Sequence, residues 1–139
     1  MFRSVAICAA LLAASLVPSA LAGDVTSLSI GDLASGDRLE VRTANYSLRF
    51  DVVDPATGEA QASLARDGKS FGRADRVFVL GATKGRHPEG LMVVRMGQLE
   101  VGKGIELAVR TMDAGNRRIT APVAAFRLMP GAGASVQRP

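Results

Sequence analysis

Apolar and polar residues alternate along residues 39–55 of this chain. Leu48, Phe50 and Val52 fall at every second position, and the residues between them are polar or charged. Because successive side chains of a strand point to opposite faces, this spacing predicts a sheet with one apolar and one charged face. We expect two strands here, joined near residues 44–45, with later segments covering the apolar face.

Short strands separated by turn residues are expected along the rest of the chain. Residues 76–80 are apolar without alternation, which is typical of a strand buried on both faces. Residues 91–96 predict a further strand, and glycine or proline interrupts the chain about every ten residues. The sequence therefore predicts an all-β fold, a small antiparallel β-barrel or sandwich of about seven short strands.

Three local expectations accompany this fold. Residues 105–110 alternate strictly, so the odd-numbered apolar residues are expected to face the core and the others, Glu106 among them, to face solvent. Phe78 falls at a predicted core position. Residues 59–65 predict a returning strand, although alanine and glutamate favour helices and leave a helix as the alternative for residues 59–66.

The N-terminal stretch has the features of a secretory signal peptide. Arg3 gives a short positive start, residues 5–17 are almost purely apolar, and Ala20 and Ala22 form the small-x-small pattern that signal peptidase cleaves. The apolar run is shorter than the roughly 20 residues that span a bilayer. We therefore expect cleavage after Ala22, with an uncleaved membrane anchor as the alternative.

The expected organisation is a signal peptide at residues 1–22, a single β-domain at residues 23–129 and a flexible tail at residues 130–139. The only cysteine, Cys8, lies in the signal peptide, so the mature chain is expected to have no disulfide and no thiol nucleophile. No later segment is apolar for long enough to cross a membrane. We expect a secreted or periplasmic protein.

Charge is distributed unevenly along the chain. The sequence has 17 lysines and arginines against 13 acidic residues, a formal net charge of +4. Residues 23–65 are acidic overall, and residues 66–139 are basic overall. Either the fold has a basic side that attracts anions, or a meander of strands mixes the two halves in space. Mixing is the simpler interpretation.

A cationic loop follows the strand predicted at residues 76–80. It resembles a phosphate-binding loop in composition, but it lacks the spacing of the P-loop and the helix that should follow. The loop remains a candidate anion site, together with a pair of arginines nearer the C-terminus. The candidate anion-binding residues are Lys84, Arg86, His87, Arg117 and Arg118.

The sequence assigns no catalytic residue. His87 is the sole histidine and the one available base for a catalytic triad, but no Gly-x-Ser-x-Gly nucleophile motif occurs. One histidine and no mature cysteine argue against a metal site, and we expect no metal and no cofactor. Two acidic pairs, Asp51 with Asp54 and Glu100 with Glu106, are expected to be solvated on outward faces rather than to form an acid/base couple.

Few aromatic residues are available for a stacking surface. The chain has one tyrosine, five phenylalanines and no tryptophan, and Phe50 and Phe78 fall at core positions. A nucleic-acid partner is therefore not expected. The partners that the sequence leaves open are a second copy of the chain or an envelope protein, bound through an exposed strand edge, and an anionic polymer or lipid headgroup.

Two stretches of the C-terminal half carry a family resemblance. Residues 97–107 form a Gly-rich extended stretch with a Leu-Glu strand, and residues 117–123 read Arg-Arg-Ile-Thr-Ala-Pro-Val. Together they resemble the ending of a group of small uncharacterised bacterial proteins that close on Arg-x-x-Thr-Ser-Pro-Val. Residues 43–46 and 53–55 are similar to the front half of that group, and Ala121 departs from it. The resemblance implies a compact β-domain and no particular activity.

Taken together, these features predict an exported, non-enzymatic binding or structural β-domain of the cell envelope or extracellular space. The sequence does not indicate its ligand. One alternative is a small hydrolase that uses the loop at residues 84–89. The other is a basic module that docks on anionic polymers or lipid headgroups.

Overall fold

The computed structural model describes residues 25–86 and 92–131, and these form an antiparallel all-β fold. The predicted signal peptide, residues 132–139 of the predicted tail and His87 lie outside the described residues. The strands are β1 (Ser27–Ser29), β2 (Arg38–Thr43), β3 (Ser47–Asp54), β4 (Glu59–Ala65), β5 (Asp75–Arg86), β6 (Met92–Met96), β7 (Gln98–Glu100), β8 (Gly104–Val109), β9 (Arg117–Ile119) and β10 (Val123–Met129), and two 3₁₀ turns are η1 (Ile30–Asp32) and η2 (Ala114–Asn116). The all-β prediction is confirmed, and residues 59–65 form a strand rather than a helix.

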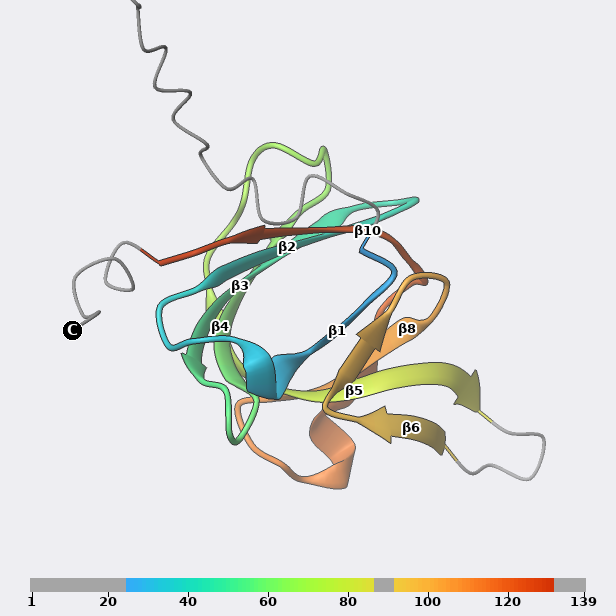
Figure 1. Cartoon of the computed structure of the whole chain (residues 1–139). Helices are drawn as coiled ribbons and strands as arrows, with labels where there is room; N and C mark the ends of the chain where they lie inside the picture. Colours follow the sequence, from blue (N-terminus) through green and yellow to red (C-terminus); the bar gives the residue numbers. More distant parts are fainter. Residues whose placement is uncertain (1–24, 87–91, 132–139) are drawn as a thin grey trace, which may run out of the picture.

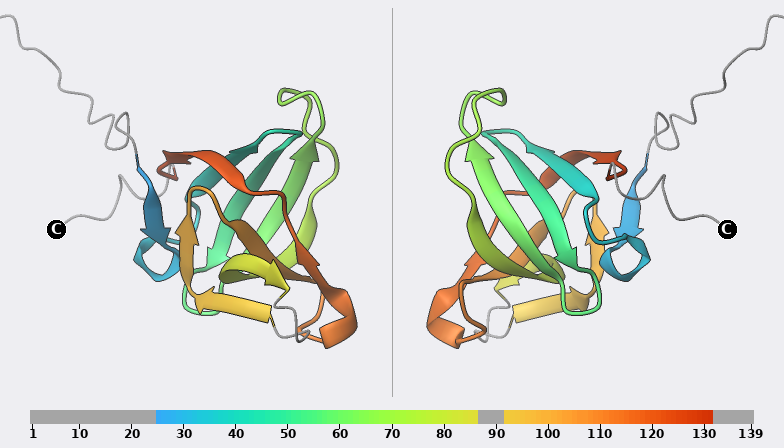
Figure 2. Two further views of the ribbon diagram at one scale, coloured as in Figure 1. Left: turned by 90° about the vertical axis from the view of Figure 1, so that its right-hand side faces the viewer. Right: turned by 90° about the vertical axis from the view of Figure 1, so that its left-hand side faces the viewer.

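The strands form one large curved sheet and one small sheet (Figure 1). The large sheet has the order β10-β2-β3-β4-β5-β8-β9, and β6 pairs with β5 beyond Glu59, the first residue of β4. The small sheet pairs β1 with β7. Figure 2 shows the large sheet curling around the core with β1 at one side. The arrangement is sandwich-like and is not a closed barrel.

The core lies on the inner face of the curved sheet. Alternating residues of β2 and β3 point into it, as the sequence predicted, and Phe50 is fully buried. Leu28 of β1 and Leu99 of β7 pack in the same cluster and cover it. Burying an apolar side chain of this size contributes about 1.5–3 kcal/mol, so these strands are held mainly by their inward residues.

Two predictions about side-chain orientation are wrong, and Ala108, which was also expected to face solvent, is fully buried. Glu106 is only 1% exposed rather than solvated, because β9 pairs with β8 and Arg117 donates a hydrogen bond to its carboxylate. Phe78 is not in the buried core, since it lies opposite Glu59 on the outer face. There the guanidinium of Arg76 lies 5.0 Å from the centre of the Phe78 ring.

Strand β5 changes partner halfway along its length. It pairs with β4 up to Phe78 and with β6 from Gly81, and a register shift in its pairing with β8 falls between these positions. Gly81 has a φ of +152°, and a Cβ added there would overlap the backbone carbonyl of Arg95 on β6. Only glycine allows this close backbone approach.

We expect Gly81→Ala to lower the free energy of unfolding by about 3 kcal/mol, because it combines backbone strain with a clash against backbone that cannot move aside. Gly85→Ala is the matched control, since Gly85 also has a positive φ but nothing lies within 4 Å of an added Cβ. It should cost about 1 kcal/mol. Urea denaturation measures the free energy of unfolding of both variants. Equal losses of this free energy would contradict the importance of the close approach at Gly81.

Candidate functional site

An apolar groove with a volume of about 460 Å³ opens at the end of the sheet where β3 begins and β4 ends. Val77 of β5 and Leu107 of β8 are almost fully buried and form its floor. Leu64 and Ile119 are 39% and 41% exposed, which is high for large apolar side chains. The groove is lined by Tyr46, Leu48, Ala62, Ser63, Leu64, Arg73, Asp75, Val77, Leu107, Val109, Arg118, Ile119 and Thr120.

Small residues of β4 leave room for this groove. Ala62 lies opposite Phe50 on one side and Asp75 on the other, at a position where a longer inward side chain would project into the hollow. The sequence shows the alanines of this strand, but the prediction did not recognise that they leave space on its inner face. This was the signal from which the groove could have been inferred.

The polar rim of the groove carries two cations without a carboxylate partner among the described residues. Asp75 is paired with Arg110 at 3.4 Å. Arg118 donates hydrogen bonds only to backbone carbonyls, those of Gly115 and Arg117, and Arg73 has no ion pair in the described part of the chain. The rim charges that remain available to a ligand are therefore both positive.

Tyr46 ties the turn between β2 and β3 to the segment before β10. Its backbone N–H donates to the hydroxyl of Thr43 at 3.1 Å, which fixes the turn. Its phenol oxygen accepts a hydrogen bond of 2.8 Å from the backbone N–H of Ala121, between β9 and β10. Because Tyr46 also lines the groove, these two bonds fix part of the groove border.

The structure does not bring the described members of the predicted anion-binding set together. Arg117 is paired with the buried Glu106 at 3.0 Å, and Arg118 lies on the groove rim. Val79 of β5 pairs with Leu107 of β8, and Leu107 pairs with Arg118 of β9, so these three residues form one row across the sheet. Lys84 is exposed on β5, in a row five residues further along the strand. At ~3.3 Å per residue, roughly 16 Å separates the two rows.

Arg86 ends β5, and His87 lies outside the described residues, so a base in this loop stays a prediction. Three of the acidic residues considered for acid/base chemistry contact cations instead. Asp51 is paired with Arg38, Glu100 with Arg95 and Lys103, and Glu106 with Arg117. The hydrogen bond from Lys103 lowers the pKa of Glu100. These contacts favour a structural role for the three carboxylates.

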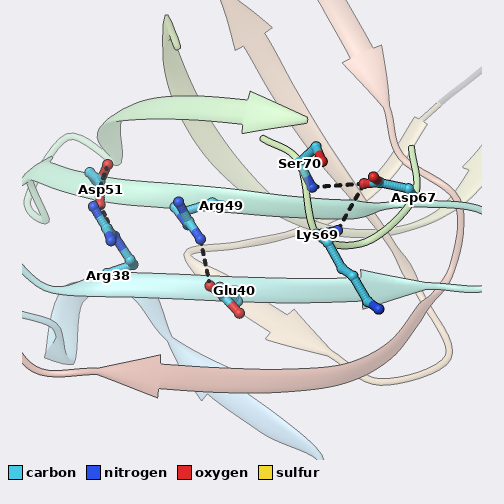
Figure 3. Close-up of polar contacts among 7 residues, drawn as sticks. All are labelled: Arg38, Glu40, Arg49, Asp51, Asp67, Lys69 and Ser70. Atoms are coloured by element: carbon cyan, nitrogen blue, oxygen red, sulfur yellow. Dashed lines mark hydrogen bonds and ion pairs between the residues drawn. The ribbon is translucent and has the colours of Figure 1, made fainter. Parts of the chain in front are cut away.

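Opposite charges face each other across β2 and β3 on the outer face (Figure 3). Arg38 contacts Asp51 at 2.6 Å, and Arg49 contacts Glu40 at 3.1 Å. The hydrogen bond to Asp51 raises the pKa of Arg38. Arg49 also lies 3.8 Å from the centre of the Phe71 ring, so the loop after β4 covers this part of the sheet. The exposed Arg38–Asp51 pair contributes about 0–1 kcal/mol, and both pairs hold register rather than bind ligands.

No protein-family model, curated protein or solved structure matches this chain. Among residues 25–86 and 92–131, no group of three or more potential metal ligands occurs. The same residues include no helix of the length and hydrophobicity that a membrane span requires. The case for a function therefore rests on the groove and on the distribution of charge.

Asp67 organises the loop that carries Phe71 and Arg73. Its carboxylate accepts hydrogen bonds from the backbone N–H groups of Lys69 at 2.9 Å and Ser70 at 2.7 Å (Figure 3). These bonds, the one from Ser70 first, lower the pKa of Asp67 from 3.8 to about 2. The ionised carboxylate thus holds the turn in place, because the charged form is the better acceptor.

We expect Asp67→Ala to lower the melting temperature at pH 6 and to have much less effect at pH 2. Because the folded pKa lies below the ordinary value of 3.8, the stabilisation is present above that pH and is lost as the pH falls toward about 2. Asp32→Ala is the control, since Asp32 is exposed and its carboxylate has no ion pair among the described residues. Calorimetry across this pH range measures the difference, and a pH-independent loss would contradict the assignment.

Proposed function

We propose that this chain is an exported, non-enzymatic binding domain whose groove takes an anionic amphiphile. The apolar part of the ligand lies over Val77 and Leu107, and its anionic group lies at the rim near Arg73 and Arg118. The observation that carries the proposal is an apolar groove of about 460 Å³ whose uncompensated rim charges, among the described residues, are both positive. Its size and composition fit small-molecule sites, which are concave, mostly apolar and have few polar groups.

Apolar contact supplies most of the affinity in this proposal. Each buried methylene contributes about 0.8 kcal/mol, whereas an exposed ion pair contributes about 0–1 kcal/mol. A chain of several methylenes therefore outweighs the contribution of either arginine. The guanidinium groups select the ligand instead, because they form paired hydrogen bonds with carboxylate or phosphate oxygens and lose this match with a neutral end group.

Export is part of the proposal and is supported by the leader-like features of residues 1–22. A mature domain without cysteines is compatible with a secreted or periplasmic location. Expression of the full gene in its host should yield a mature protein that begins at Gly23, as read by intact mass spectrometry. A protein that retains residues 1–22 would contradict export by cleavage.

The groove is tested by calorimetric titration with dodecanoate and with methyl dodecanoate. Ala62→Phe places a ring in the groove and should weaken both ligands by about tenfold or more, because the space for their chains is occupied. Ala124→Phe is the matched control, since Ala124 is exposed on β10 and does not line the groove. It should leave both affinities unchanged.

In the same titration, the double variant Arg73→Gln/Arg118→Gln distinguishes the ionic contribution of the rim to affinity from the apolar contribution of the groove. It should weaken dodecanoate by about three- to tenfold, as loss of two exposed ionic contacts implies, and leave the methyl ester unaffected. Equal losses for acid and ester would contradict the role of the rim cations. Absence of binding by both ligands would overturn the proposal, and hydrolysis of the ester would overturn its non-enzymatic part.

A further inference from the structure

Basic side chains of the described residues fall into those paired with a carboxylate and those without such a partner. The paired ones are Arg38, Arg49, Arg76, Arg95, Lys103, Arg110 and Arg117. Four cations outside this group lie together, on the outer face of the sheet and in the loop after β4. We call them the outer cluster, and they are Arg42, Arg66, Lys69 and Arg127.

Strand pairing places two arginines of the outer cluster side by side. Arg127 of β10 lies opposite Glu40, and Arg42, two residues further along β2, lies opposite Ala125. Side chains related in this diagonal way lie about 7–8 Å apart, within reach of long side chains. Figure 3 shows the Lys69 side chain extending from its loop toward β2. The cluster therefore draws on three segments that are distant in sequence.

Two shallow pockets run through the outer cluster. The first, of about 250 Å³, lies between Arg127 and Arg42, and the second, of about 180 Å³, lies between Arg42 and Arg66. Both pockets are lined by Arg42, Ser47 and Gly68, so they are adjacent. We call the two adjacent pockets the depression; Arg42 borders both of them, Arg127 borders only the first and Arg66 only the second.

The acidic groups of this depression already have hydrogen-bond donors. Glu40 accepts from Arg49 at 3.1 Å, and Asp67 accepts from the backbone N–H groups of Lys69 and Ser70. Asp67 is the only carboxylate lining the two pockets that lacks an ion pair with an arginine or lysine in the described part of the chain. The three arginines that line the two pockets, Arg42, Arg66 and Arg127, thus outnumber this one carboxylate, and the local potential is positive.

We propose that the outer cluster binds a linear polyanion, a polymer that carries repeated sulfate, phosphate or carboxylate groups. Several cations along one depression match repeated charges better than a single small anion, and guanidinium groups pair well with such oxygens. A membrane surface fits less well. Docking on a membrane uses apolar anchors, and no large exposed hydrophobic residue of the described chain lines either pocket. This site shares Tyr46 with the groove border but is lined by different cations, and it does not depend on the function proposed for the groove.

The test compares two triple variants for binding to heparin, a sulfated polysaccharide used as the probe. The cluster variant is Arg42→Gln/Arg66→Gln/Arg127→Gln. The matched control removes the same number of charges from three exposed arginines that line neither the groove nor the two pockets, Arg76→Gln/Arg95→Gln/Arg110→Gln. Circular dichroism and melting temperature verify that both variants fold.

The cluster variant should bind heparin at least about tenfold more weakly, and the slope of log affinity against log salt should fall by about two, since three ionic contacts are lost. The heparin affinity of the control variant should stay within about twofold of that of the unmodified protein. Equal losses in the two variants would mean that net charge alone attracts heparin and would overturn the site. Tighter binding to phosphatidylglycerol vesicles than to heparin, lost in the cluster variant, would overturn the polymer assignment in favour of a membrane surface.

Discussion

The fold depends on one place where two backbones meet without a side chain between them. At Gly81 the long strand β5 leaves β4 and joins β6, while β8 stays paired along its other edge. This change of partner turns the second half of β5 out of the path of the first half. The sheet can then curve around Phe50 and its neighbours, and β1 and β7 cover the remaining side. A side chain at this point would separate the strands.

The curvature of the sheet also explains why the groove exists. A curved sheet brings the inner faces of β4, β5 and β8 toward one another, and the short side chain of Ala62 leaves the space between them incompletely filled. Tyr46 then bridges to Ala121 and fixes the border of the opening. The groove is thus a consequence of how the core is closed at this end, and it needs no additional loop or domain.

Alternation in the sequence predicted the strands and their inner faces well. It identified two strands within residues 39–55 with Phe50 in the core, because one buried face imposes a period of two. It could not show which residues flank the second face, so the burial of Glu106 beside Arg117 of β9 and the outward position of Phe78 were missed. The candidate functional site was harder to predict from the sequence than the strands were. The sequence shows how many cations there are, but strand register decides which ones meet a carboxylate, as Arg117 does, and which ones border the groove, as Arg118 does.

Tyr46 gives this protein an internal optical reporter. It is the only tyrosine, and the chain has no tryptophan, so near-ultraviolet emission arises almost entirely from one phenol. Tyr46 lines both the apolar groove and the pocket between Arg42 and Arg66. Its hydroxyl contacts the backbone N–H of Ala121, and displacement of this contact would change the emission. A ligand on either surface is therefore expected to change the emission of unlabelled protein, from a single chromophore with a known position.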